Sequence, residues 1–238
     1  MRLDLFVSQA QNCTRTRAAN IIKMGGVTVN GRVVLKAGAE VSLQDEVLIR
    51  DLIKFASLGG VKLENALTTF SLDLKDAVCL DLGAANGGFT HCMLSRGAAS
   101  VDAVDLTLAF DPALRDDPRV TMHDGVNVKE IANVFPEKRF DFVSVDLSFI
   151  SLAPLFPLFY YLLKEGGELI ALFKPQYEVG KKYLPKSGVV HDKKAMAAAF
   201  SHLKKSAEEA GFDFLGECDV PEYFSDKNKE KTVLFSKK

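Results

Sequence analysis

The chain has 238 residues, of which 47% are hydrophobic and 26% are charged, and its formal net charge is −1 at pH 7. This composition is typical of a globular protein with a sizeable core, and it argues against intrinsic disorder. The nearly balanced charge argues against a uniformly basic nucleic-acid-binding protein.

The first predicted elements are two short helices. Apolar residues recur at helical spacing over residues 3–10 and indicate the first helix. Thr14 is suited to cap a second helix, and Gly25-Gly26 ends it.

A compact β segment follows these helices. The stretch VTVNGRVV at 27–34 alternates around Asn30-Gly31, which is the strongest short hairpin signal, and DEVLIR at 45–50 predicts a further strand. Residues 1–55 carry eight Lys and Arg against five Asp and Glu, a net charge of +3. A solvated charged face and a surface for an acidic partner are both compatible with this excess.

The N-terminal stretch RLDLFVSQAQNCTRTRAANIIKMGGVTVNGRVV resembles the small RNA-binding module first described in ribosomal small-subunit protein four. The most specific part of the resemblance is GVTVNG. The resemblance implies an RNA-binding module over residues 1–50. The stretch RDLIKFAS at 50–57 has little turn chemistry and indicates a short connection, so we expect a linker over residues 51–57. Its basic residues are the candidate RNA contacts: Arg2, Arg15, Arg17, Lys23 and Arg32.

From residue 58 onward, predicted strands and helices alternate. We expect strands near 77–82, 100–105, 119–122, 140–146, 168–174, 212–218 and 231–236, and helices near 62–70, 88–96, 127–134, 153–164 and 192–210. This alternation implies right-handed crossovers and a mostly parallel sheet with helices on both faces.

The stretch LDLGAANGGFT at 80–90 predicts a ligand-binding loop after the first strand of this sheet. Ligands of open α/β sheets bind beyond the carboxyl ends of the strands, and glycines let the backbone approach them closely. Asp105 ends the next strand and is suited to bind ribose hydroxyls, while Asp124 could accept a hydrogen bond from an adenine amino group. The candidate cofactor residues are Asp81, Gly83, Ala84, Gly87, Gly88, Phe89, Asp105 and Asp124. On these residues alone, a dehydrogenase fits equally well.

Several stretches favour a methyltransferase. LLKEGGELIALFKP resembles a segment of S-adenosylmethionine-dependent methyltransferases, and DLGAANGGFT is similar to the cofactor loop of FtsJ-type ribose 2′-O-methyltransferases. LGGVKLENAL, VSVDLSFISL, FKPQYEVGKK and KSGVVHD together resemble the TlyA (hemolysin A) family over nearly the whole chain. The resemblance implies a Rossmann-like methyltransferase domain over residues 58–238 with a seven-stranded, mostly parallel sheet. It also implies S-adenosylmethionine as cofactor and methylation of cytidine 2′-hydroxyls in ribosomal RNA.

The same resemblance nominates a catalytic tetrad of Lys62, Asp146, Lys174 and Glu230. The predicted topology makes their convergence plausible, because Asp146 and Lys174 follow parallel strands. Glu230 begins the last strand, which starts at the same edge if that strand is antiparallel. Lys62 would lie in the first turn of its helix. We expect Lys174 to act as the base, with Asp146 and Lys62 positioning the hydroxyl and Glu230 holding a lysine.

Other sequence features argue against a metalloprotein and against a membrane protein. The four cysteines and four histidines show no metal-ligand spacing, so no metal is expected. The apolar run at 149–163 contains two prolines and is too short for a membrane helix, so we expect a cytoplasmic protein without membrane contact. Lys181, Lys182 and Lys186 could bind RNA phosphates.

The alternatives to an RNA methyltransferase are a non-enzymatic RNA-binding or ribosome-assembly protein, a membrane-active hemolysin and a nicotinamide dehydrogenase. The expected partner is ribosomal RNA or a ribosomal subunit. The modified nucleotide, the subunit and the oligomeric state stay open.

Overall fold

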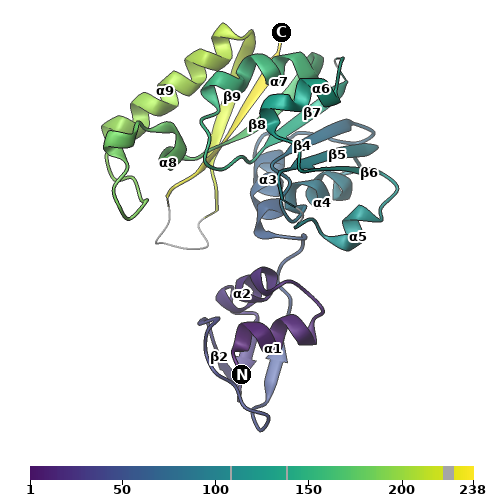
Figure 1. Cartoon of the computed structure of the whole chain (residues 1–238), viewed down its shortest axis with the longest axis vertical. Helices are drawn as coiled ribbons and strands as arrows, with labels where there is room; N and C mark the ends of the chain where they lie inside the picture. The colour runs from purple at the N-terminus through teal and green to yellow at the C-terminus, as the bar shows by residue number, and fades with distance from the viewer. Residues whose placement is uncertain (108, 138, 222–227) are drawn as a thin grey trace. The chain divides into compact units, whose positions relative to one another are not determined.

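The computed structural model describes residues 1–107, 109–137, 139–221 and 228–238. The chain forms two compact units, Met1–Leu58 and Gly59–Lys238 (Figure 1). Each unit has its own sheet.

The first unit is a small α+β module. It contains α1 (Leu3–Ala10), α2 (Arg15–Lys23), β1 (Val27–Val29), β2 (Arg32–Val33) and β3 (Val47–Ile49). The strands form an antiparallel sheet in the order β2-β1-β3. Both predicted helices, the hairpin and the third strand are confirmed.

Local sequence explains the turns of this module. The Thr14 hydroxyl accepts a hydrogen bond from the Arg17 backbone N–H, so the predicted helix cap is confirmed. Asn30 and Gly31 have φ angles of 50° and 76°, as a two-residue hairpin turn of type I′ needs. The helices and the sheet bury a common core of Leu3, Val7, Ala18, Ile21, Ile22, Val27, Val41 and Ile53.

The second unit alternates strands and helices. Its strands are β4 (Val78–Leu82), β5 (Ser100–Asp105), β6 (Val120–Asp124), β7 (Phe140–Val145), β8 (Leu163–Phe173), β9 (Phe212–Asp219) and β10 (Lys231–Lys237). Its α-helices are α3 (Leu58–Thr69), α4 (Gly88–Ser95), α5 (Pro112–Arg115), α6 (Ile131–Val134), α7 (Phe156–Leu162), α8 (Pro175–Glu178) and α9 (Lys193–Glu209). Three 3₁₀ turns are η1 (Val128–Glu130), η2 (Ala153–Leu155) and η3 (Lys181–Tyr183).

The strands of the second unit form one sheet in the order β6-β5-β4-β7-β8-β10-β9. Strands β4 to β8 pair in parallel, whereas β10 is antiparallel to β8 and β9. The predicted seven-stranded, mostly parallel sheet is therefore confirmed. Because β10 is antiparallel, its first residue lies at the edge where the parallel strands end, as the tetrad prediction required.

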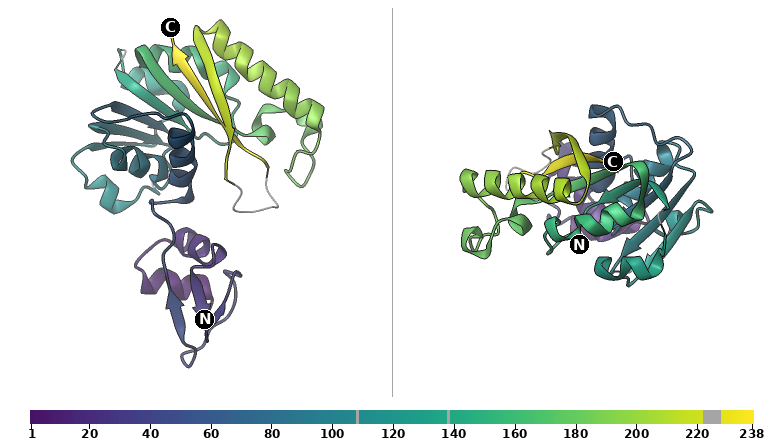
Figure 2. Two further views of the ribbon diagram at one scale, coloured as in Figure 1. Left: turned by 180° about the vertical axis from the view of Figure 1, so that it is seen from behind. Right: turned by 90° about the horizontal axis from the view of Figure 1, so that it is seen from above.

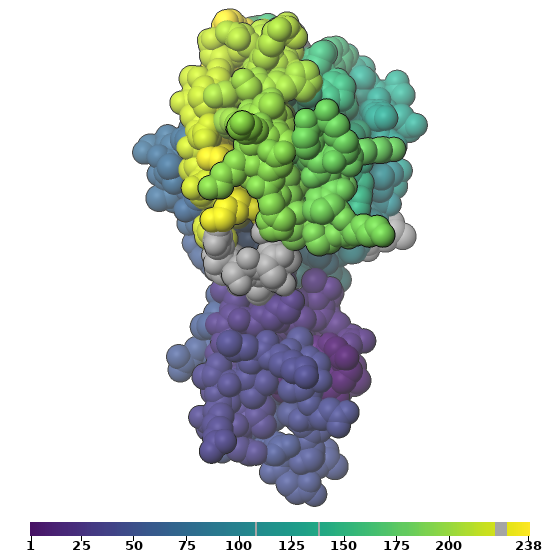
Figure 3. Space-filling view, turned by 90° about the vertical axis from the view of Figure 1, so that its left-hand side faces the viewer, coloured from purple at the N-terminus to yellow at the C-terminus, as the bar shows by residue number. Residues whose placement is uncertain are grey.

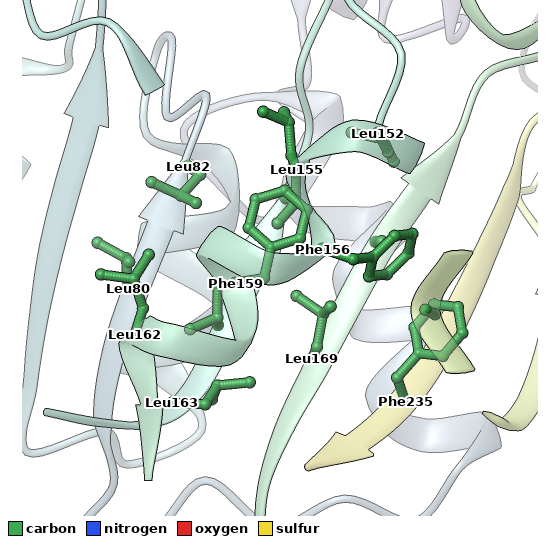
Figure 4. Close-up of a cluster of buried hydrophobic side chains, with 14 of the residues drawn as sticks. Leu80, Leu82, Leu152, Leu155, Phe156, Phe159, Leu162, Leu163, Leu169 and Phe235 are labelled. Atoms are coloured by element: carbon green, nitrogen blue, oxygen red, sulfur yellow. The ribbon is translucent and has the colours of Figure 1, made fainter. Parts of the chain in front are cut away.

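Helices cover both faces of this sheet (Figures 1 and 2). Side chains of α6, α7 and α9 pack into one large core cluster, and the apolar run at 149–163 supplies much of it through η2 and α7 (Figure 4). Phe156 is fully buried, and its ring meets those of Phe159, Phe212 and Phe235 edge-on at centroid distances of 5.2–5.8 Å.

Three local features differ from the sequence prediction. Helix α3 begins at Leu58, four residues earlier than predicted, so Lys62 lies in its second turn. Strand β8 begins at Leu163 opposite Phe140 and bulges before Glu168 pairs with Phe142, with Gly166 at a φ of 72°. The short helices α5 and α8 were not predicted. Each starts with a proline after an extended residue, a signal that is easily missed in a single turn.

Candidate active site

The first pair of the predicted tetrad forms where β7 and β8 end. Asp146 follows β7, Lys174 follows β8, and the two strands are parallel neighbours. The Lys174 Nζ lies 2.5 Å from Asp146 Oδ1 and donates a hydrogen bond to the Ser148 hydroxyl at 3.1 Å. Lys174 is only 8% exposed, so its ammonium depends on these protein partners more than on water.

The second pair joins α3 to the start of β10. The Lys62 Nζ donates to Glu230 Oε2 at 2.5 Å, and both side chains are largely buried. In the β8–β10 ladder Lys231 pairs with Phe173, so the preceding Glu230 and the following Lys174 meet at the same edge. The structure therefore brings all four predicted tetrad residues to one edge of the sheet.

One oxygen of this cluster lacks a hydrogen bond. Among the residues that the structure describes, only Asp146 Oδ1 and Gln176 Oε1 are buried side-chain oxygens without a hydrogen-bond partner. The Lys174 ammonium is within ion-pair distance of Asp146 Oδ1 but is not aligned for a hydrogen bond. The buried carboxylate is therefore paired with the ammonium and is not isolated. A hydroxyl bound at this edge would lie beside both groups.

The glycine loop between β4 and α4 packs against the backbone of Asp146. Gly83 has a φ of 88°, and a Cβ there would lie 2.5 Å from the backbone oxygen of Asp146. Gly87 has a φ of 83° and is the N-cap residue before α4, and a Cβ there would overlap Leu114 and Phe110. These glycines let the loop pack against protein atoms that a side chain would overlap.

Asp81 holds the end of the loop through hydrogen bonds to Thr90 in α4. It is fully buried, and its carboxylate accepts hydrogen bonds from the backbone N–H and hydroxyl of Thr90 and from the Ser144 hydroxyl. Ala84 and Phe89 are also buried. These three candidate cofactor residues thus shape the loop.

The pH dependence of folding should reveal Asp81. Burial raises the pKa of its carboxyl from 3.8 to about 7. Between these values the folded state binds more protons than the unfolded state, so this group makes stability fall as pH rises from about 4 to 7. In urea unfolding, Asp81→Asn should therefore gain unfolding free energy relative to the wild type between pH 4 and pH 8. If the difference in unfolding free energy between the two proteins were the same at pH 4 and at pH 8, the raised pKa of Asp81 would be contradicted.

The two other acidic candidates already have protein partners. Asp105 accepts from the backbone N–H of Ala85 at 2.9 Å and from the N–H and hydroxyl of Thr107 at 2.6 and 2.7 Å. Each carboxylate oxygen has two lone pairs, so a ribose hydroxyl can still bind there. Asp124 forms two hydrogen bonds with Arg115 at 2.6 and 2.9 Å, and this guanidinium lowers the pKa of Asp124.

The basic residues of the first unit differ in their partners. Arg2 and Arg15 both bind the buried carboxylate of Asp4, whose pKa they hold far below its usual value. Arg17 binds Asp51 and the backbone oxygens of Ile53 and Phe55. Its guanidinium thus fixes the segment that was predicted as a linker.

Lys23 lies in the last turn of α2, and Arg32 is an exposed residue of β2. In the second unit, Lys181, Lys182 and Lys186 are exposed in the segment after α8, which projects in green in Figure 3. Asn228, before β10, fixes this segment by accepting from the Val190 N–H and donating to the Gly188 carbonyl, both at 2.8 Å.

Three residues beside the tetrad were missed by the sequence analysis. Ser148 contacts Lys174, Gln176 carries the second unpaired buried oxygen, and Glu178 accepts hydrogen bonds from Ser151 and Leu152. The available signal was their place in DLSFISL and FKPQYEVG, the stretches that carry Asp146 and Lys174.

The sheet order, the antiparallel β10 and a glycine loop beside clustered lysines and carboxylates define a Rossmann-like methyltransferase. Residues 55–238 match the family model described as FtsJ-like methyltransferase, and residues 1–47 match the S4 domain. The 16S/23S rRNA (cytidine-2′-O)-methyltransferase TlyA of Mycobacterium tuberculosis is 36% identical over 208 residues, covering 85% of this chain and 77% of that protein. The chain belongs to the TlyA family of FtsJ-like methyltransferases.

Two solved structures are similar to the chain. A "putative hemolysin" from Streptococcus thermophilus is 31% identical with a TM-score of 0.77, covering 100% of this chain and 88% of that one. An S-adenosylmethionine-dependent methyltransferase from Mesorhizobium loti is 18% identical with a TM-score of 0.58, covering 76% of this chain and 100% of that one, and it shows the fold alone. In the described part of the chain, no helix has the length and apolar character to cross a membrane, and no group of three side chains could hold a metal ion.

Proposed function

We propose that the chain transfers a methyl group from S-adenosylmethionine to the ribose 2′-hydroxyl of a nucleotide in ribosomal RNA, with cytidine as the target. The observation that carries this proposal is the convergence of two lysine–carboxylate pairs, Lys174 with Asp146 and Lys62 with Glu230, at the edge where the parallel strands end. A ribose hydroxyl bound at this edge would lie next to a lysine that can take its proton. The match to an rRNA 2′-O-methyltransferase supports the substrate class.

The glycine loop fits the cofactor. Gly83 and Gly87 let the loop pack closely against Asp146 and Leu114, where side chains would overlap, and Asp105 can bind ribose hydroxyls. Asp124 would contact the adenine amino group beside its partner Arg115. Bound S-adenosylmethionine supplies the electrophilic methyl carbon and a thioether leaving group.

The tetrad residues then have separate tasks. Asp146 pairs with Lys174, whose nitrogen lies 2.5 Å from its Oδ1, and so holds the amine beside the 2′-hydroxyl. Lys174, as a neutral amine, takes the hydroxyl proton while the oxygen–carbon bond forms and the carbon–sulfur bond breaks. Glu230 holds the Lys62 ammonium at the same edge. That ammonium stabilises the negative charge that develops on the 2′-oxygen.

RNA mapping tests this function directly. Ribose methylation of 16S and 23S rRNA should be compared by mass spectrometry between cells with and without the protein. The proposal expects a 2′-O-methylated nucleotide that depends on the protein. Identical ribose methylation in both samples would contradict it and would favour a non-enzymatic ribosome-assembly role.

The first unit should supply much of the RNA affinity. Replacing Arg15 and Arg32 with glutamine should weaken binding to rRNA and reduce the slope of log affinity against log salt by about 0.7–0.9 for each phosphate contact that is lost. Lys205→Gln, on an exposed position of α9, is the matched control. Equal salt slopes for the double variant and the control would show that these arginines do not contact phosphates.

A further inference from the structure

Two chain segments flank Lys174 and Asp146. The loop of residues 146–152 connects β7 to η2, and α8 follows Lys174 directly. Asp146 is the first residue of this loop, so its placement depends on how the loop is held.

Glu178, the last residue of α8, binds the far end of the loop. Its Oε2 accepts a hydrogen bond from the Ser151 hydroxyl at 2.7 Å, and its Oε1 accepts one from the Leu152 backbone N–H at 2.9 Å. The Leu152 N–H stands at the start of η2, where a backbone donor has no partner within the helical turn. Both oxygens of Glu178 are therefore used to fix the loop.

The near end of the loop is bound by Lys174 itself. The Lys174 Nζ donates to the Ser148 hydroxyl at 3.1 Å. Lys174 directly precedes α8, and Glu178 is the last residue of that helix. The two segments are thus joined twice, at Lys174 and at Glu178.

The loop needs such support because it contains a strained residue. Phe149 has a φ of 66° and is 90% exposed, and its ring centroid lies 5.2 Å from that of Tyr177 in α8. A bulky residue in this region costs about 1–3 kcal/mol and persists only when its surroundings hold it there. Releasing one end of the loop would allow Phe149 to relax and would displace Ser148.

We propose that Glu178 is a positioning residue for methyl transfer, which braces the loop of residues 146–152 against α8 and so keeps Asp146 and Ser148 in place beside Lys174. This inference rests on the proposed function. It assigns Glu178 no contact with substrate or cofactor. Its removal should therefore slow the chemical step and leave the binding of both ligands nearly unchanged.

The test uses single-turnover methylation of ribosomal subunits by the full chain. Glu178→Ala should lower the rate at saturating ligand by at least about tenfold, with dissociation constants for S-adenosylmethionine and rRNA within about twofold of the wild type. Glu178→Gln should restore most of the rate, because its amide can accept from Leu152 and donate to Ser151. Glu208→Ala, at an exposed position of α9, is the control and should behave as the wild type.

A normal rate in Glu178→Ala, or a Glu178→Gln protein as slow as the alanine variant, would overturn the proposed positioning role of Glu178. If Glu178→Ala fails to fold, Ser151→Ala removes only the Oε2 contact, and a rate equal to the wild type would then overturn it. Hydrogen exchange of residues 147–152 should be faster in Glu178→Ala than in Glu208→Ala, and equal exchange contradicts the brace without reference to activity. A wild-type protein that methylates no RNA would instead refute the proposed function.

Discussion

Lys174→Ala is expected to abolish single-turnover methylation of rRNA while the affinities for RNA and S-adenosylmethionine stay close to normal. Proton removal is needed in the transition state and not for binding. General-base removal typically lowers a rate by about 10²–10⁴-fold. Rapid-quench measurement of methyl transfer, together with calorimetry for the cofactor, separates the two effects.

Two further variants make this result specific. Lys174→Arg should not restore the rate, because a guanidinium keeps its proton at any workable pH. Lys164→Ala is the matched control, since Lys164 lies at the opposite end of the same strand and also forms an ion pair, with Asp141 at 2.7 Å. Lys164→Ala should keep its activity. A Lys174→Arg protein with a near-normal rate would show that the position supplies only charge.

Gly83→Ala should remove cofactor binding. Its Cβ would lie 2.5 Å from the Asp146 backbone oxygen at a φ of 88°, so the loop or the residue after β7 must move. The variant therefore disturbs the cofactor loop and Asp146 together, and we expect at least about a hundredfold loss of S-adenosylmethionine affinity, or about 2.7 kcal/mol, by calorimetry.

Gly166→Ala separates this overlap from ordinary backbone strain. Gly166 has a φ of 72°, and a Cβ there would meet nothing within 4 Å. This control should lose about 1 kcal/mol of stability, as expected for a side chain in the left-handed region, and should keep its cofactor affinity. If Gly83→Ala bound the cofactor as well as Gly166→Ala, the loop would not be the cofactor site.

The sequence predicted the elements whose signals are local. The Asn30-Gly31 turn, the Thr14 cap and the strands at 78–82 and 100–105 follow from residue type and periodicity. The convergence of Asp146 and Lys174 follows from a general property of parallel strands, whose carboxyl ends share one edge. Pairing of Glu230 with Lys62 depended on the direction of β10, which the sequence left conditional.

Features that depend on contacts between distant residues could not be predicted. Arg17 stays a predicted RNA contact, and its guanidinium also binds Asp51 and two backbone oxygens that lie 34 to 38 residues away, contacts that no local pattern indicates. The brace from Glu178 to Ser151 spans 27 residues and gives no periodic signal. The role of Arg115 beside Asp124 depends on the single helical turn of α5, which is too short to show an amphipathic pattern.

The most direct test of the central claim is the chemical identity of the product. The purified chain should be incubated with ribosomal subunits and S-adenosylmethionine labelled in its methyl group, and the rRNA should then be digested to nucleosides and analysed by mass spectrometry. We predict that the label resides on the ribose as a 2′-O-methylnucleoside, and that Lys174→Ala yields none. Label on a nucleobase, or an equal yield from Lys174→Ala, would contradict the proposed transfer at the edge formed by Lys62, Asp146, Lys174 and Glu230.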